Sequence, residues 1–429
     1  MNRYANMIRA LKTPSVMAQL IHLYGNRDGM LVAQTARYTG VLKRHEEYFN
    51  SDREVLLVSA PGRTEVGGNH TDHNRGRVLA AAVNLDTLAA VSARDDMLVH
   101  LHSEGYPAMT VDLGDLTARK EEEGTTAALI RGVAARMAEL GYKIGGFDAA
   151  MTSSVASGSG LSSSAAFEVL TCAILDALYN GFVIDFKTRA KISQFAENVY
   201  FGKPSGLLDQ MASAAGGLVT VDFREEDPDV RPMAFDFAAH GYALVVVGTG
   251  GSHADLTDHY AAIPQEMKAV AQHFGQPYLR LVRPEDFMQQ IGQLRGKVSD
   301  RAILRAIHFY QDHQRVTRQV EALDRDDLDT FLAEVIASGR SSFMYLQNVY
   351  AYPQEQSLSV ALAMAEDMLA GKGAWRVHGG GFAGTTLNIV HQSDLKHFIE
   401  RMESVFGAHS CHILDIRPVG AAVLKMDDR

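Results

Sequence analysis

Cysteine is scarce in this chain. Only two of the 429 residues, Cys172 and Cys411, are cysteines, and they lie far apart in segments that are mostly apolar. Two thiols are too few for a disulfide framework or for a cysteine-based zinc site. Buried free thiols are typical of proteins in a reducing compartment. The pattern therefore predicts a protein without disulfides, and we expect it in the cytoplasm.

An excess of positive charge is also missing. The chain has 41 lysines and arginines against 51 aspartates and glutamates, a formal net charge of −10. Because a broad nucleic-acid surface needs a basic stripe, we expect no nucleic-acid partner. No apolar run reaches the ~18 residues that span a bilayer, and residues 1–25 lack the apolar core of a signal peptide. We therefore expect no membrane association, and a monomer or weak homo-oligomer.

The chain is long and apolar enough to form two domains. Hydrophobic residues make up 46% of it, and its length is about three times that of a usual domain. Helices are expected over residues 1–50, and strands and helices then occur in separate clusters, which favours an α+β fold over a regular βαβ array. The acidic, proline-bearing segment 224–232 suggests a boundary between domains at 1–230 and 231–429. The first strands are expected at residues 55–60, 78–84, 87–93 and 97–103.

Residues 158–164, Gly-Ser-Gly-Leu-Ser-Ser-Ser, are the most informative stretch. The glycines allow a close backbone approach, the serines suit a helix start, and an apolar helix is expected at 165–175. Such a junction directs several N–H groups and the positive end of the helix dipole at one place, which suits phosphate. No lysine stands in or beside the stretch, so it is not the lysine-bearing P-loop. Taken alone, it also fits a flexible linker that enters an ordinary helix.

Residues 60–76 form the densest polar cluster, between a strand expected to end at Pro61 and an apolar run that begins at Val78. Convergent acid, imidazole and amide groups suit a sugar, because each hydroxyl both donates and accepts hydrogen bonds. Two other interpretations stay open: a loop whose Asp72 and Asn74 cap turns, or a metal site built on His70, Asp72 and His73. The polar residues of the cluster are Arg63, Glu65, Asn69, His70, Asp72, His73 and Asn74.

Two carboxylates and a second glycine motif complete the candidates. Asp209 follows a glycine- and proline-rich turn in GKPSGLLDQ, and Glu197 lies on a helix expected near 187–200. Each could be a functional acid, a helix cap or a solvated carboxylate. The segment 378–384, HGGGFAG, matches GxGxxG, but a strand rather than a helix is expected after it, which disfavours a dinucleotide site. Its glycines would instead let the backbone pass close to a ligand.

In their order along the chain, APGRxxxxGxHTDHNxG, SGSGLSSSAA, GLLDQMAS and HGGGFAGT resemble the GHMP family of small-molecule kinases and, within it, the galactokinase subfamily. The resemblance spans nearly the whole chain. It implies an α+β two-domain GHMP kinase fold with an N-terminal α/β domain, a C-terminal ferredoxin-like α+β domain and an active site in the inter-domain cleft. It also implies ATP as the phosphate donor, Mg²⁺ as the metal and a sugar as the acceptor.

The resemblance also assigns roles to individual residues. Asp209 matches the acid placed at the anomeric hydroxyl, with Arg63 beside it to stabilise the transferring phosphoryl group. Ser164 and Glu197 match the positions that hold Mg²⁺. Residues matching the phosphate-binding positions are Gly158, Ser159, Gly160, Leu161, Ser162, Ser163 and Ser164, and those matching the sugar-binding positions are Asn69, His70, Asp72, Tyr260 and Gly380.

One departure from the family pattern concerns the acceptor. Galactokinases usually read GEHTDYN where this chain reads GNHTDHN, so Asn69 replaces a glutamate expected near the sugar's 6-hydroxyl. Because a neutral amide does not repel an anionic C6 group, the acceptor is either galactose or a C6-altered relative such as galacturonate. A further alternative is a non-catalytic sugar sensor, which the retention of Asp209, Arg63 and Glu197 disfavours. The HTDHN segment disfavours mevalonate, homoserine and heptose as acceptors.

Overall fold

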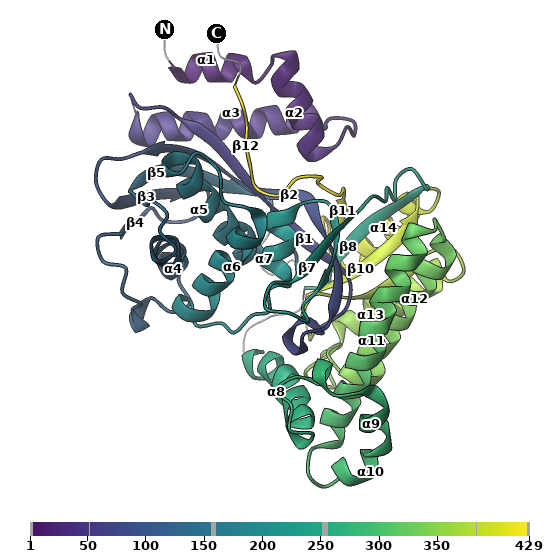
Figure 1. The fold of residues 1–429 in the computed structure, drawn as a ribbon. Coiled ribbons are helices and arrows are strands. Elements are labelled where there is room, and N and C mark those ends of the chain that lie inside the picture. Colours follow the sequence, from purple (N-terminus) through teal and green to yellow (C-terminus); the bar gives the residue numbers. More distant parts are fainter. Residues whose placement is uncertain (1–2, 51, 156–159, 251–255, 383, 427–429) are drawn as a thin grey trace.

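The computed structural model describes residues 3–50, 52–155, 160–250, 256–382 and 384–426. An eight-stranded sheet and a four-stranded sheet form its framework (Figure 1). Helices α1–α3 cover one face of the larger sheet and α4–α7 cover the other, and each face has its own apolar cluster. The smaller sheet lies beside the long helices of the C-terminal half. The expected α+β class is confirmed.

The predicted helical lead over residues 1–50 is confirmed. Several helices begin where the sequence provides an N-cap: the side chains of Thr13, Thr125 and Asp185 each accept a hydrogen bond from the backbone three residues on. The helices of the N-terminal half are α1 (Arg3–Ala10), α2 (Pro14–Tyr24), α3 (Met30–Phe49), the 3-10 turns η1 (Asp72–Asn74) and η2 (Lys120–Glu122), α4 (Thr126–Glu139), α5 (Ser163–Tyr179), α6 (Phe186–Phe195), the π-helix η3 (Ala196–Tyr200) and α7 (Leu208–Ala215).

The larger sheet has the order β12-β1-β2-β5-β3-β4, with β6 paired to β2 and β7 paired to β6. All of its pairs are antiparallel except β3 with β5. Its central strands are rich in valine and alanine because both of their faces are covered. Its strands are β1 (Leu56–Gly67), β2 (Arg77–Ala93), β3 (Leu98–Ser103), β4 (Met109–Asp112), β5 (Phe147–Ser153), β6 (Leu218–Asp222), β7 (Asp229–Met233) and β12 (Ala422–Val423).

Two strand predictions were wrong. The strands expected at 78–84 and 87–93 are one continuous strand, β2, because no glycine or proline interrupts residues 85–86. The strand expected to end at Pro61 continues to Gly67. Register shifts on either side of residues 63–65 let β1 accommodate the proline, and between them the pairing with β2 is regular. Arg63 and Glu65 therefore lie on a strand rather than in a loop.

The four-stranded sheet has the order β11-β8-β10-β9 and is antiparallel throughout. Its strands occur along the chain in a β-α-β-β-α-β sequence, the arrangement of ferredoxin-like folds. The elements of this half are β8 (Tyr242–Gly248), α8 (Thr257–His273), η4 (Leu279–Leu281), α9 (Pro284–Gln289), α10 (Ile291–Leu294), α11 (Asp300–Asp324), α12 (Leu328–Ser341), the π-helix η5 (Ser342–Leu346), α13 (Ser357–Leu369), β9 (Ala374–His378), β10 (Thr385–His391), α14 (Leu395–Phe406) and β11 (Cys411–Leu414).

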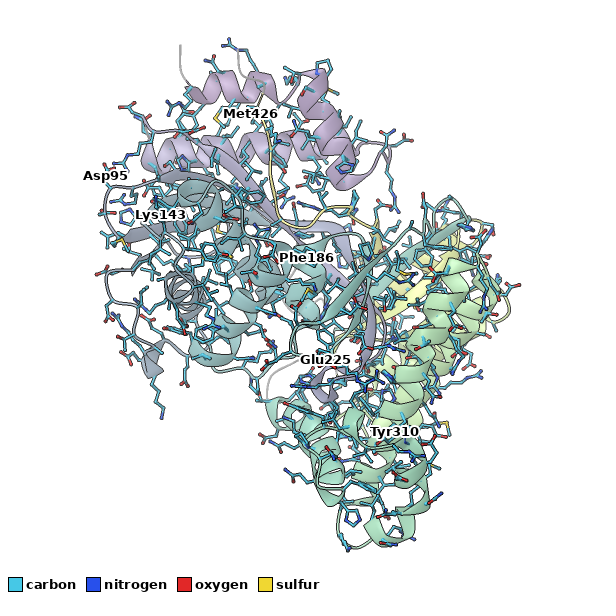
Figure 2. The ribbon with its side chains drawn as sticks, in the orientation of Figure 1. Asp95, Lys143, Phe186, Glu225, Tyr310 and Met426 are labelled. Atoms are coloured by element: carbon cyan, nitrogen blue, oxygen red, sulfur yellow. The ribbon has the colours of Figure 1, made fainter. Side chains whose placement is uncertain are left out.

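Helices α8–α10 and the start of α11 form a separate apolar unit at the lower end of the molecule (Figure 1). Tyr310, labelled in Figure 2, belongs to this unit: its ring lies 5.2 Å from that of Phe287, and its hydroxyl donates to the carbonyls of Leu279 and Val282. This unit carries Tyr260 at the start of α8 and so fixes one side of the candidate site.

The predicted domain boundary at residue 230 lies inside β7, and the chain returns to the larger sheet at its C-terminal end, where β12 pairs with β1. The two halves also meet through β1, since Arg376 Nη1 of β9 donates to the carbonyl of Val66 at 2.9 Å. No helix in the described part of the chain is long and apolar enough to cross a membrane.

Candidate active site

Arg63 and Asp209 form a bidentate ion pair at the junction of β1 and α7. Arg63 Nε donates to Asp209 Oδ1 at 2.7 Å, and Nη2 donates to Oδ2 at 2.8 Å. Arg63 is 6% exposed, whereas 30% of the Asp209 side-chain surface is accessible. Ser162 Oγ donates to Asp209 Oδ2 at 2.6 Å. The polar cluster at residues 60–76 and the glycine loop, which the sequence analysis treated separately, therefore both contact the Asp209 carboxylate. Its accessible surface lets an incoming hydroxyl group reach it.

These contacts keep Asp209 ionised. Burial raises the pKa of this carboxyl, but the charge of Arg63 and the hydrogen bonds from Arg63 and Ser162 outweigh burial and lower the pKa to about 2. A carboxylate with so low a pKa orients a hydroxyl group well but accepts its proton only once the hydroxyl oxygen has become acidic. That condition arises when this oxygen bonds to phosphorus.

The glycine loop passes directly over Arg63. The carbonyl of Leu161 accepts from the backbone N–H of Arg63 at 3.0 Å, and the carbonyl of Gly160 accepts from Arg63 Nη1. A Cβ on Gly160 would lie 2.3 Å from Thr385 Oγ1, so only glycine fits there. Ser162 adopts a left-handed backbone (φ 59°), after which α5 begins at Ser163.

This turn leaves the first N–H groups of a 17-residue helix at the loop, which suits phosphate. The predicted phosphate contacts of Gly158 and Ser159 lie outside the described residues.

Ser164 and Glu197 are brought together as predicted for a metal site. Ser164 Oγ donates to Glu197 Oε1 at 3.0 Å, and Glu197 is buried in the π-helix η3. Adjacent hydroxyl and carboxylate oxygens are donors that fit Mg²⁺, which takes one or two protein oxygens together with phosphate oxygens and water. The wider helical turn of η3 places Glu197 toward α5, and such π-turns are frequent at functional sites.

Three residues that were not among the predicted site residues surround Glu197. Lys203 Nζ donates at 2.9 Å to Glu197 Oε1, the oxygen that also accepts from Ser164 at the end of the glycine loop. Gln210 Nε2 donates to Glu197 Oε2 at 2.7 Å and to Glu168 Oε2 at 3.0 Å. Burial, followed by the charge of Glu197, raises the pKa of Glu168 well above its usual value. Glu168 therefore binds a proton more readily than an ordinary glutamate and lies next to Glu197 through their shared partner Gln210.

The sequence held partial signals for two of these residues. Lys203 stands six residues after Glu197, and Gln210 directly follows Asp209. Their contacts with Glu197 could not be predicted from the sequence, because they depend on the path of the chain through the π-helix η3. Glu168 looked like an ordinary position on an apolar helix.

His70, Tyr260 and Gly380 converge on the second glycine motif. His70 Nε2 lies 3.0 Å from the carbonyl of Gly380, and Tyr260 donates to the carbonyl of Gly381 at 2.9 Å. Burial lowers the pKa of His70 to about 3, so its ring is neutral and donates to this carbonyl. A Cβ on Gly380 would lie 2.6 Å from the Tyr260 ring, so this position requires glycine. These residues form a wall between the two halves of the chain.

Asp72 lies against the loop that leads to Asp209. A Cβ on Gly206 would lie 1.7 Å from Asp72 Oδ2, so the carboxylate rests directly on that backbone. Its other near neighbour is His73, with Nε2 3.8 Å from Oδ1. Among the described residues, no group of three or more histidine, cysteine, aspartate or glutamate side chains could hold a metal ion. The alternative of a metal site on His70, Asp72 and His73 therefore has no structural support.

Asn69 is fully buried, and the protein occupies its hydrogen-bonding groups. Its Nδ2 donates to Glu65 Oε1 at 2.9 Å and to the carbonyl of Gly379 at 2.7 Å. Its Oδ1 accepts from Asn348 Nδ2 at 2.8 Å. The sugar contact expected of Asn69 stays a prediction, and it would require one of these bonds to break. Its backbone groups bond to Asp312 and His308.

Comparison with known proteins places this site in a family. The galactokinase galactose-binding signature matches residues 43–93, and the GHMP kinase N-terminal domain matches residues 128–217. The galactokinase of Streptomyces coelicolor is 33% identical over 374 residues, which cover 85% of this chain and 92% of that protein. Human galactokinase is 30% identical over 397 residues, covering 88% and 94% of the two chains.

Solved structures agree at the level of the fold. The galactokinase of Lactococcus lactis, solved in complex with galactose, superposes with a TM-score of 0.80 at 23% identity, covering 90% of this chain and 99% of that one. The mevalonate kinase of Methanococcus jannaschii gives a TM-score of 0.61 at 13% identity, covering 85% and 99%. The long matches to galactokinases, together with the Arg63–Asp209 pair and the glycine loop beside it, establish that this chain belongs to the galactokinase family of GHMP kinases.

Proposed function

We propose that this protein transfers the γ-phosphoryl group of ATP to the anomeric hydroxyl of galactose. The observation that carries the proposal is the bidentate Arg63–Asp209 pair, held by Ser162 at the start of the phosphate loop. It places an ionised acid and a fixed cation beside the N–H groups that would hold the phosphates. The galactokinase relatives named above support galactose as the acceptor.

In this proposal Asp209 orients the anomeric hydroxyl and takes its proton as the new O–P bond forms. Arg63 keeps Asp209 ionised until then and places positive charge where the transferring phosphoryl group passes. Most catalysis of phosphoryl transfer comes from such positioning and electrostatic stabilisation. When Asp209 becomes protonated, Arg63 loses its ionic partner and remains available to the phosphate oxygens.

Ser164 and Glu197 would hold Mg²⁺ with the nucleotide. When bound, Mg²⁺ neutralises charge on the phosphate oxygens. The chain's own part is to keep Glu197 aimed at Ser164, which Gln210 does through its hydrogen bond to the other carboxylate oxygen.

His70, Asp72, Tyr260 and Gly380 would surround the sugar on the side away from the phosphates. His70 and Tyr260 both bond to the backbone of residues 380–381, so the sugar would bind between groups fixed by both halves of the chain. Such fixed donors and acceptors distinguish hydroxyl positions because a missing or misplaced hydroxyl leaves one of them unpaired. We place the protein in the cytoplasm because one cysteine is buried and the other half-buried, and both are free.

A steady-state assay of ADP release tests this function. We expect turnover with galactose in the presence of ATP and Mg²⁺, and much less with glucose. Galacturonate tests the C6-altered alternative, since efficient turnover of that sugar without turnover of galactose would replace the proposed acceptor. A protein that binds ATP and galactose without releasing ADP would instead be the sensor.

A further inference from the structure

Glu65 is a second buried carboxylate on the strand that carries Arg63. The two residues lie in the regular part of β1, paired with Ala80 and Ala82 of β2, so their side chains emerge on the same face. Their positions along the strand are about 7 Å apart. Only 7% of the Glu65 side-chain surface is exposed. A carboxylate this buried calls for an explanation, because burial of an ionised group is costly unless it is well partnered.

The contacts of Glu65 are one-sided. Arg376 Nη2 donates to Oε1 at 2.6 Å, and Asn69 Nδ2 donates to the same oxygen at 2.9 Å. Within the described part of the chain nothing donates to Oε2, yet this atom is not among the sealed side-chain oxygens that lack a partner. Glu65 thus has one oxygen fixed by the protein and one that receives no hydrogen bond from the described residues.

Glu65 also interacts electrostatically with charged residues of the candidate active site. Burial raises the pKa of Glu65 to about 7, the cations Arg376 and Arg63 lower it, and the carboxylate of Asp72 raises it. Glu65 lies beside the candidate active site, because it shares a strand face with Arg63 and because Asn69 donates both to Glu65 and to the carbonyl of Gly379 in the second glycine motif. His378 of β9 accepts from the backbone N–H of Glu65 at 3.3 Å and closes the other side.

Asn69 is poorly placed to contact the sugar itself, because its hydrogen-bonding groups are already used. The oxygen of its side chain accepts from Asn348, and its nitrogen donates to Glu65 and to a backbone carbonyl. The Asn69 amide instead fixes the carboxylate of Glu65, since it donates a hydrogen bond to Oε1, the oxygen that Arg376 also holds. The carboxylate that position 69 lacks is therefore present four residues earlier, on β1.

We propose that Glu65 recognises the acceptor sugar by accepting, through Oε2, a hydrogen bond from a hydroxyl group at the end of the ring remote from C1. Arg376 and Asn69 act as positioning residues for this carboxylate. The inference rests on the proposed kinase function, which sets C1 at Asp209. The spacing of Arg63 and Glu65 on β1 then places the C4 and C6 hydroxyls on the Glu65 side. An acceptor with an anionic C6 group would meet this carboxylate, which favours a neutral hexose.

The test compares three sugars with wild-type protein and with Glu65→Gln: galactose, 4-deoxygalactose and 6-deoxygalactose. A hydrogen bond to a charged group contributes about 1.5–3 kcal/mol, equivalent to about 10- to 100-fold. We expect Glu65→Gln to lower kcat/KM for galactose by that factor and to change it little for the one deoxy sugar that lacks the bonded hydroxyl. Whichever deoxy sugar is insensitive identifies the hydroxyl.

Two controls keep the test independent of folding. The ratio of kcat/KM values for two sugars in one preparation does not depend on the fraction of folded protein. Glu122→Gln makes the same change in another ion pair, where the partly buried Glu122 contacts the buried Arg131, and should leave the ratios unchanged. If Glu65→Gln does not fold because Arg376 is left unpaired, the double variant Glu65→Gln, Arg376→Gln removes both charges.

Equal losses for all three sugars would overturn the inference, as would a wild-type protein that does not discriminate between galactose and either deoxy sugar. Failure of the proposed function looks different, because the wild-type protein would then turn over none of the three.

Discussion

Arg63 and Asp209, 146 residues apart, are joined by two parallel hydrogen bonds of 2.7 and 2.8 Å. The guanidinium of Arg63 also contacts the carbonyl of Gly160, so one side chain connects the acid, the glycine loop and β1. This arrangement explains why the acid stays ionised although it is partly enclosed by the protein. It also makes the pair the part of the site where a substitution has the clearest consequences.

Asp209→Asn removes the charge and the proton acceptor while keeping the size of the side chain. We expect kcat to fall by about 10²- to 10⁴-fold, the usual contribution of a positioned acid or base. Binding of ADP, measured by calorimetry, should change little, because the residues proposed to hold the phosphates and Mg²⁺ are other ones. A variant with wild-type kcat would contradict the role given to Asp209.

Arg63→Lys keeps the charge but cannot form the two parallel hydrogen bonds, because an ammonium group has no planar fork. We expect kcat with galactose to fall by about 10²- to 10³-fold, as when one transition-state donor is lost. The loss should appear in kcat rather than in KM for ATP. Full activity would show that the charge alone is sufficient.

The pH dependence of the rate separates two carboxylates. The pKa of Asp209 is about 2, below its usual value, so Asp209 stays ionised and causes no change in rate between pH 5 and 8. The pKa of Glu65 is about 7, so Glu65 loses its proton within this range and becomes a better acceptor. We expect kcat/KM for galactose to rise with pH through about 7.

The matching control is Glu65→Gln, in which this inflection should disappear. Arg63, Arg376 and His378 are not expected to replace this inflection, since an arginine keeps its charge in this range and burial lowers the pKa of His378 well below its usual value. An unchanged profile in the variant would assign the inflection to another group.

The stability of the protein should change with pH in the opposite direction to the rate. Unfolding releases the Glu65 proton between about pH 4.5 and 7, so the free energy of unfolding falls as pH rises through that range.

Lys203→Met tests the contact between Lys203 and Glu197. Without the ammonium group, Glu197 loses a counter-charge beside the buried Glu168, so we expect a lower Tm for the metal-free protein. Mg²⁺ with ADP should then raise Tm more in the variant than in the wild type, because the metal supplies the missing charge. Lys187→Met, which removes a surface contact to Asp227 at 3.4 Å, is the control. Equal shifts in both variants would mean that Lys203 acts only as a surface charge.

The sequence predicted the helical lead, the α+β class and most helices because these follow from local periodicity and capping residues such as Thr13 and Asp185. It did not predict the continuous strand β2, because turn signals were assumed where the chain has only Leu85 and Asp86. Local patterns also cannot show contacts between distant residues. The joining of Arg63 to Asp209 came from the family resemblance, not from spacing.

Glu65 shows the same limit in the site itself. As long as the strand was expected to end at Pro61, Glu65 was one more polar residue of a loop. Once β1 is seen to continue to Gly67, alternation along the strand puts Glu65 on the face of Arg63. Its neighbours Arg376 and Asn69 come together only through the packing of β9 against β1.

The most direct test of the account is the product formed from ATP, Mg²⁺ and galactose, identified by phosphorus NMR. We expect ADP and galactose carrying a phosphate on C1 with the wild-type protein, and the same products formed at least about 100-fold more slowly with Asp209→Asn. Phosphate on any other carbon, or no sugar phosphate from a protein that binds both substrates, would contradict it.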